Sequence, residues 1–179
     1  MSYLYPRQPT IKNGRIMAMK HNNYAFIDSQ NLNLGVQGMG WRLDFAKFRV
    51  YLRQRFRVKK AFIFIGYIES NKRLYEFLEN AGYILVYKPT IESKGETKGN
   101  VDAELVLHAA AIEYDNYDQA VIVSGDGDFR CLIEFLIERK KLRRMIVPNI
   151  HKYSSLLTEF EKDITFLNGT RNKLERKRK

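Results

Sequence analysis

Four aspartates stand where their carboxylates could act together. Asp28 directly follows the apolar segment 24–27, and Asp126 and Asp128 follow the apolar segment 119–123. Asp102 comes from a third place, after a polar stretch and at the start of a helical pattern. Carboxylate oxygens are hard ligands that suit Mg²⁺ or Mn²⁺ rather than zinc. We therefore expect a divalent-cation centre at the paired acids Asp126 and Asp128, with Asp28 at the end of another strand.

The segment Ser124-Gly-Asp-Gly-Asp128 carries most of this interpretation. Two carboxylates two residues apart, at a glycine-bearing turn, disfavour each other's ionisation, so the pair needs a cation or a solvent-open cleft. The alternative is a turn in which Asp126 caps a helix that starts near Gly127. That alternative explains one acid well and two less well, and it leaves Asp28 and Asp102 unexplained.

Three further polar residues have a possible place near these acids. Asn31, three residues after Asp28, and Ser124 could orient a carboxylate, a water or a phosphate, although each is also an ordinary turn or capping residue. His108 follows Asp102 on the same helical pattern and could approach the cleft, but a buried, hydrogen-bonded histidine is at least as plausible. The chain has no CxxC, HExxH, GxGxxG or Walker motif.

Short apolar segments alternate with longer helical patterns along the chain. Segments rich in Val, Ile and Phe predict strands, and segments with apolar residues three or four apart predict helices. The predicted strands are 24–27, 61–66, 83–87, 119–123 and 142–147, with 164–167 as a short edge strand. The predicted helices are 42–56, 71–80, 101–114, 127–140 and 151–160, and the polar segment 90–100 is predicted to be a mobile loop.

Strands that are apolar on both faces and alternate with helices predict a parallel sheet covered on both sides. We therefore expect an α/β fold, a three-layer sandwich around a mostly parallel sheet of about five strands. In such a sheet, ligands bind beyond the carboxyl ends of the strands, which is where Asp28, Asp126 and Asp128 stand. No internal repeat or second domain is evident.

Positive charge is concentrated in three parts of the chain, whose formal net charge is +11. Residues 1–23 carry no acid, residues 171–179 carry a single one, and residues 42–60 hold eight basic residues against Asp44. Basic segments attract phosphate backbones without reading sequence, although a basic tail can also serve solubility. The segment 42–60 could equally form a dimer face. The predicted contacts to nucleic acid are Arg42, Arg49, Arg53, Arg55, Arg57 and Lys98.

Composition argues against a membrane or secreted protein. No apolar run approaches the roughly 20 residues of a membrane span, and the first 20 residues lack the apolar core of a secretory signal. The single cysteine, Cys131, cannot form an intrachain disulfide and is expected to be a small core residue of its helix. We expect a cytoplasmic protein without a membrane association.

Three motifs together resemble the signatures of NYN domains, the LabA-like branch of the PIN-like nuclease superfamily. They are Asp28-x-x-Asn31-Leu32, Lys98-Gly-Asn-Val-Asp102 and Ser124-Gly-Asp-Gly-Asp-Phe129. The resemblance implies a PIN-like domain over residues 23–168, with a basic N-terminal extension over 1–22 and a basic tail over 169–179. It also implies that Asp28, Asp102, Asp126 and Asp128 bind Mg²⁺ or Mn²⁺ and that Asn31 and Ser124 assist catalysis.

Two departures from the family pattern stand near Asp102. Asn100 lengthens the loop before it, and His108 or nearby Glu104 stands where many members carry an acid about two turns further along the helix. The function that the resemblance implies is hydrolysis of RNA phosphodiester bonds, with single-stranded RNA held by the basic segments. Tyr67 and Tyr87 could stack on bases, whereas Phe129 is expected in the core.

The sequence is also compatible with two other functions. One is a non-catalytic RNA-binding or regulatory module on the same fold. The other is a metal-dependent phosphatase or phosphotransferase on a different doubly wound sheet, which usually needs an aspartate nucleophile and a lysine in an order that this chain lacks. The oligomeric state, including a homodimer, is not determined by the sequence.

Overall fold

Six parallel strands form the centre of the molecule in a computed structural model. The structure describes residues 21–88 and 101–177, and outside them only the backbone of four short strands: β1 (Ile11–Lys12), β2 (Arg15–Ile16), β6 (Ile91–Ser93) and β7 (Glu96–Lys98). β1 pairs with β2 and β6 with β7, both antiparallel. Most of the predicted N-terminal extension and of the predicted loop 90–100 therefore lies outside the described residues.

The central sheet has the strand order β10-β9-β8-β3-β4-β5, and all of its neighbouring strands are parallel. Its strands are β3 (Asn23–Asp28), β4 (Val58–Gly66), β5 (Ile84–Lys88), β8 (Ala120–Val123), β9 (Leu142–Val147) and β10 (Ile164–Phe166). The α/β fold with a parallel sheet is confirmed. The strand count is six rather than about five, because the short segment 164–166 pairs fully with β9.

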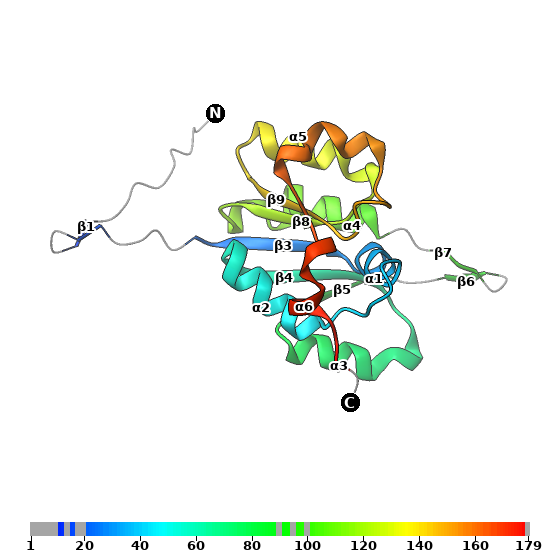
Figure 1. Ribbon diagram of the computed structural model, residues 1–179. Helices are drawn as coiled ribbons and strands as arrows, with labels where there is room; N and C mark the ends of the chain where they lie inside the picture. The colour runs from blue at the N-terminus through cyan, green and yellow to red at the C-terminus, as the bar shows by residue number, and fades with distance from the viewer. Residues whose placement is uncertain are drawn as a thin grey trace.

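Helices cover both faces of the sheet (Figure 1). They are α1 (Ser29–Gln37), α2 (Phe45–Phe56), α3 (Lys72–Asn80), α4 (Asp102–Leu107), α5 (Arg130–Glu138) and α6 (Arg171–Leu174). α4 continues into a π-helical turn, η2 (His108–Ile112). The 3₁₀ turns are η1 (Glu69–Asn71), η3 (Tyr114–Asn116), η4 (Gly127–Phe129), η5 (Ser155–Asp163) and η6 (Asn168–Thr170).

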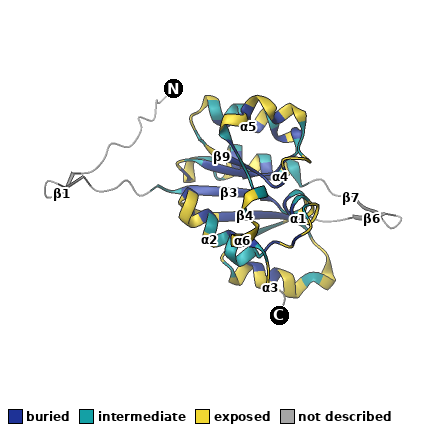
Figure 2. Cartoon of the chain, in the orientation of Figure 1, coloured by how far each residue is buried: buried dark blue, intermediate teal, exposed yellow. Residues whose placement is uncertain are grey.

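Alternate residues of each central strand enter two separate cores. In β3, Ala25 and Ile27 pack under α1, α2 and α3, whereas Tyr24 and Phe26 pack under α4, α5 and η5. Successive side chains of a strand point to opposite faces, so a strand covered on both sides is apolar at every position. Figure 2 shows this pattern: the central strands are buried along their length, and the helices alternate buried and exposed residues.

The carboxyl end of β3 turns directly into α1, which the sequence interpretation missed. Asp28 caps this helix, since its side chain accepts a hydrogen bond from the Asn31 backbone N–H. Leu32 and Val36 are the buried residues of α1. The predicted helices at 42–56, 71–80 and 127–140 are present with shifted starts, while the predicted helix 151–160 is replaced by the 3₁₀ segment η5.

The residues of the basic C-terminal tail pack on the domain up to residue 176. The Leu174 side chain is 1% exposed in the core beneath α2, and α6 lies beside α2 (Figure 1). The Asp44 N–H donates to the Leu174 carbonyl, and the Arg176 N–H donates to the Arg42 carbonyl. The packed part of the chain therefore continues through α6.

Candidate metal centre

The turn after β8 presents two carboxylates and fixes one of them by hydrogen bonds. The Asp126 N–H donates to the Ser124 hydroxyl over 3.1 Å, and the Asp128 N–H donates to Asp126 Oδ1 over 3.0 Å. Asp126 is thus the N-cap of η4, as the alternative interpretation of this segment expected. The cap uses one of its two carboxylate oxygens, which leaves the other available to the cleft.

Three aspartates converge at this turn. Asp102, Asp126 and Asp128 each offer a carboxylate oxygen, and these oxygens lie within 4.8 Å of one another. Asp102 reaches the turn because it begins α4, whose Leu105 is buried in the core beneath α4 and α5. Three hard, negatively charged oxygen donors in one place fit the ligand preference of Mg²⁺ or Mn²⁺ and offer none of the sulfur or nitrogen ligands that zinc favours.

Asp28 lies deeper than these three and is held differently. Its side chain is 5% exposed, and it accepts hydrogen bonds from the Asn31 N–H (3.0 Å) and the Ser124 hydroxyl (3.2 Å). Burial raises the pKa of Asp28 above its ordinary value, and the negative charges of Asp102 and Asp126 raise it further, against those two hydrogen bonds. Asp28 therefore adjoins the group of three without belonging to its closest set.

Asn31 and Ser124 tie the site's elements together. The Asn31 Oδ1 atom accepts a hydrogen bond from the Gly125 N–H over 2.8 Å, which joins α1 to the turn after β8. The buried Ser124 hydroxyl donates to Asp28 and accepts from the Asp126 N–H, so it contacts two of the acids. Ser124 thus holds two of the carboxylates directly, and the Asn31 side chain holds the turn that carries Asp126 and Asp128. Their assistance to catalysis stays a prediction.

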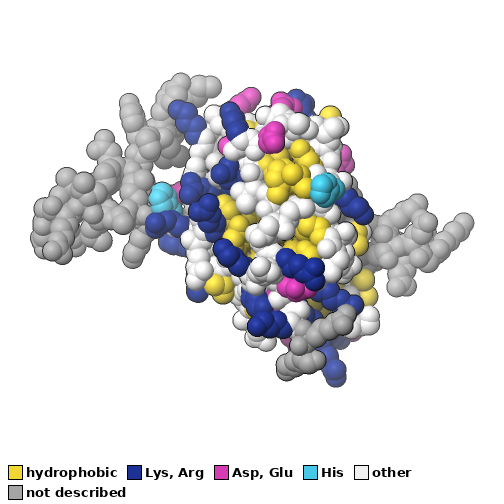
Figure 3. Space-filling view, in the orientation of Figure 1, with side chains coloured by type: hydrophobic (Ala, Val, Ile, Leu, Met, Phe, Trp, Pro, Cys, Tyr) yellow, Lys and Arg dark blue, Asp and Glu magenta, His cyan; other side chains and the backbone are white. Residues whose placement is uncertain are grey.

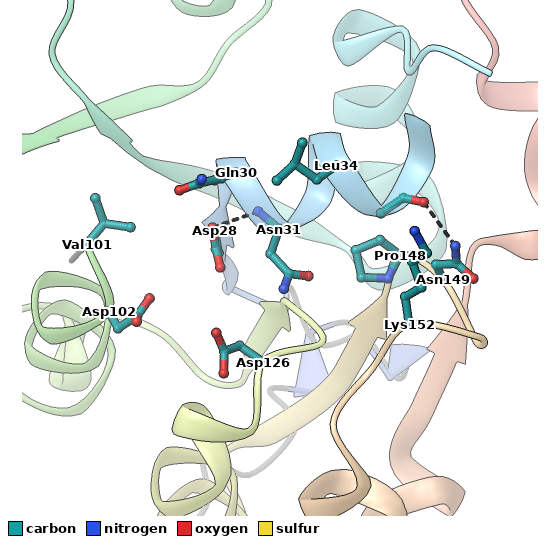
Figure 4. Close-up of a pocket in the computed structure, with 11 residues that line it drawn as sticks. Asp28, Gln30, Asn31, Leu34, Val101, Asp102, Asp126, Pro148, Asn149 and Lys152 are labelled. Atoms are coloured by element: carbon teal, nitrogen blue, oxygen red, sulfur yellow. Dashed lines mark hydrogen bonds between the residues drawn. The ribbon is translucent and has the colours of Figure 1, made fainter. Parts of the chain in front are cut away.

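A cavity of about 730 Å³ extends from the acids along α1 (Figure 4). Asp28, Asp102 and Asp126 point into one end of it, and Pro148, Asn149 and Lys152 line the other. The sequence interpretation did not identify the last three or Gln30. The position of Pro148 and Asn149 just after β9 could have identified them from the sequence, since the carboxyl ends of parallel strands share one edge of the sheet. The cleft thus has an acidic end and an end with a lysine.

His108 does not reach the acids. Its Nδ1 atom lies 2.9 Å from the Glu104 carbonyl oxygen, and its ring packs edge-on against Phe64 at 5.2 Å between ring centres. His108 is therefore a packed, hydrogen-bonded residue, which is the alternative that the sequence left open for it. Glu104 and His108 both stand outside the group of three acids.

Four of the predicted RNA-binding arginines are exposed, and one has a structural role. Arg42, Arg53, Arg55 and Arg57 are exposed. Arg49 instead donates to the carbonyls of Gly82 (2.9 Å), Val58 (3.3 Å) and Lys59, and burial lowers its pKa. Arg49 therefore joins α2 to β4 and to the turn after α3, and we remove it from the expected RNA surface. The Lys98 side chain lies outside the described residues.

Three aromatic residues and the cysteine differ in how far they are buried. Phe129 is buried in the core, as expected, and Tyr67 and Tyr87 are partly exposed with ring centres 5.5 Å apart. Cys131 is exposed, so its expected place in the core is wrong. It lies on the outer side of α5, whose buried residues are Leu132, Ile133 and Leu136.

Comparisons with known proteins agree on one family. The family model described as NYN domain matches residues 24–163. The "Low amplitude and bright protein LabA" of Synechococcus elongatus is 29% identical over 132 residues, covering 67% of this chain and 70% of that protein. A solved structure of a protein of unknown function from Vibrio parahaemolyticus shares the fold, with a TM-score of 0.70 at 22% identity, over 88% of this chain and 99% of that one. Among the residues that the structure describes, no helix is both long and apolar enough to span a membrane.

Proposed function

This chain belongs to the NYN-domain family of PIN-like nucleases, and on that premise we propose that it is a Mg²⁺- or Mn²⁺-dependent endoribonuclease that hydrolyses phosphodiester bonds of single-stranded RNA. The observation that carries the proposal is the group of three carboxylate oxygens, from Asp102, Asp126 and Asp128, within 4.8 Å at the mouth of a cleft. Such a group gathers negative charge, which a divalent cation would neutralise.

Asp102, Asp126 and Asp128 would hold the cation, with Asp28 beside them. When bound, a divalent cation supplies a Lewis acid that activates water and offsets the charge that develops on the phosphate. Asn31 and Ser124 hold Asp28 and the turn after β8 in fixed positions before substrate arrives. This preorganisation matters because a displaced carboxylate would lose much of its contribution.

The rest of the cleft suits an RNA strand. Lys152 can contact a phosphate at the end of the cavity away from the acids. Tyr67 follows β4, and Tyr87 is the last residue but one of β5, at the edge of the sheet that carries the acids. Their partly exposed rings can stack on unpaired bases.

The test is cleavage of a labelled single-stranded RNA in the presence of Mn²⁺ or Mg²⁺, with and without chelator. The wild type should cleave only with the cation, and Asp126→Asn should lower the rate on the order of 100-fold. Glu161→Gln is the matched control, because this exposed carboxylate has no side-chain hydrogen bond or ion pair within the described part of the chain. Full activity of Asp126→Asn would refute the catalytic role. RNA binding that survives chelator, without product under any condition, would instead identify a non-catalytic RNA-binding module.

A further inference from the structure

A second, smaller cavity lies away from the acidic cleft. It has a volume of about 150 Å³ and is lined by Arg55, Phe56, Arg143, Arg144 and Thr165. We call these five residues the arginine pocket. They come from the end of α2, the first half of β9 and the middle of β10, and none of them lines the cleft. The arginine pocket is therefore separate from the acidic cleft and lies at the end of α2.

The arginine pocket gathers three positive charges around one small cavity. Within the described ranges, Arg55, Arg143 and Arg144 form no ion pair with an acidic side chain. Arg144 is anchored, because its Nη1 atom donates to the Lys162 carbonyl over 2.7 Å. Like charges around a small cavity repel one another, and an anion between them removes that repulsion. Guanidinium groups match the oxygen geometry of phosphate and can bind it with paired hydrogen bonds.

A β-bulge places two consecutive arginines on this pocket. The pairing of β8 with β9 passes from Ala120 opposite Leu142 to Val121 opposite Arg144, so Arg143 has no partner in the ladder. In a regular strand, Arg143 and Arg144 would point to opposite faces of the sheet. A bulge re-aims the side chains beside it, and here both residues line one cavity. The pocket is thus formed by a specific irregularity of the backbone.

The pocket lies within a wider basic surface. Arg53 and Arg57 are exposed on either side of Arg55 in the sequence, and Figure 3 shows a band of Lys and Arg side chains over the end of the molecule where α2 stops. This is the end where the parallel strands begin, whereas the acids stand where they finish. A six-residue strand such as β3 spans roughly 20 Å, so a ligand that touches both sites must be an extended one.

We propose that the arginine pocket binds a backbone phosphate of the RNA at a distance from the acidic cleft. The inference rests on the proposed RNA substrate and adds a second contact point to it. An RNA that reaches both sites gains affinity from the pocket, whereas an RNA confined to the cleft gains none. The contact is to phosphate and therefore does not depend on base sequence.

The experiment measures RNA binding by fluorescence anisotropy in chelator, so that its outcome does not depend on catalysis. Arg55→Ala and Arg143→Ala are compared with Arg73→Ala, which removes the same charge from an exposed position on α3. Each protein is titrated with a labelled single strand of about 20 nucleotides and with a trinucleotide, at several salt concentrations. Thermal melting checks that each variant is folded, which exposed positions should allow.

The pocket variants should bind the long RNA about tenfold more weakly than wild type, the loss expected for one charge-assisted contact. The slope of log affinity against log salt should fall by roughly 0.7, the value for one phosphate of a single strand. Affinity for the trinucleotide should not change. The proposal is overturned if the pocket variants match Arg73→Ala with the long RNA, or if they weaken long and short RNA equally. Cleavage can fail while this difference persists, so the two proposals are tested separately.

Discussion

Gly127 separates the two acids of the turn after β8, and a side chain there has no room. A Cβ atom on Gly127 would lie 2.3 Å from Ser154 Oγ, 2.9 Å from Ser154 Cβ and 3.1 Å from Leu156 Cδ1. The first two distances are shorter than any normal contact, so either Ser154 or the turn must move. The φ angle of Gly127 is not positive, so lack of space is the only reason for glycine at this position.

Gly127→Ala should destabilise the protein by about 1–3 kcal/mol, the usual cost of forcing an extra carbon into a packed site. Ser154 cannot yield freely, because its hydroxyl caps η5 and its N–H donates to the Gly125 carbonyl over 2.9 Å. For a chain of this length, that loss lowers Tm by roughly 3–10 °C. The turn carries Asp126 and Asp128, so Mn²⁺ affinity should also fall, by about 10- to 100-fold.

Thermal melting and Mn²⁺ titration calorimetry measure these two effects. Gly169→Ala is the control, since a Cβ on Gly169 meets no atom within 4 Å. The double variant Gly127→Ala with Ser154→Gly removes both short contacts and should recover Mn²⁺ affinity relative to Gly127→Ala alone, despite losing the cap of η5. The reasoning is refuted if Gly127→Ala melts and binds Mn²⁺ as wild type does, or if removing the Ser154 side chain brings no recovery.

Three other substitutions test separate parts of the structure. Burial raises the pKa of Asp28 above 3.8, so ionised Asp28 opposes folding. In chelator, Asp28→Asn should therefore be more stable than wild type at neutral pH. Its advantage in urea unfolding should shrink as pH falls through the raised pKa and vanish below the ordinary value of 3.8. An advantage that grows toward low pH would contradict this. Leu174→Ala should cost about 2–5 kcal/mol in the same assay, while Leu156→Ala, at a 56% exposed position, should cost little; equal costs would mean that α6 is not docked. Arg49→Ala should lose about 1–3 kcal/mol of stability, because its hydrogen bonds to backbone carbonyls are lost. Its RNA affinity should equal that of Arg73→Ala. A large loss of affinity at full stability would show that Arg49 contacts RNA.

The sheet could be predicted because its strands are apolar on both faces, a pattern that few other structures produce. α1 could not, since its nine residues include four amide side chains, a serine and a glycine, and only Leu32 and Val36 are buried. The glycine, Gly35, is required by a contact distant in sequence: a Cβ there would lie 2.6 Å from Pro148 Cβ. Such a reason becomes visible only when α1 is placed against the end of β9.

The candidate site was predictable in its composition and less so in its arrangement. Strand ends and motifs selected the four acids, but the sequence interpretation gave Asp102 the weakest support of the four. The structure places Asp102 in the closest group and sets Asp28 deeper, hydrogen-bonded to Asn31 and Ser124. The difference arises from the packing of α4 on the sheet, which a local pattern does not reveal.

Long-range contacts also decide two features of the surface that local sequence patterns do not show. The tail after residue 168 reads as basic and polar, yet it docks through one leucine and through backbone hydrogen bonds to Arg42 and Asp44. Cys131 stands in an apolar helical stretch, but the rotation of α5 on the sheet turns it outward. In both cases, contacts with residues distant in sequence decide whether the side chain is buried or exposed.

The most direct test of the central claim is a crystal structure of the protein soaked with Mn²⁺, with anomalous data collected to locate the ion. We expect an anomalous peak within coordinating distance of Asp102, Asp126 and Asp128, at the acidic end of the cleft, and no peak at that place in crystals of Asp126→Asn. A wild-type crystal with no peak there, or with its peak elsewhere on the molecule, would show that these acids do not form a metal centre.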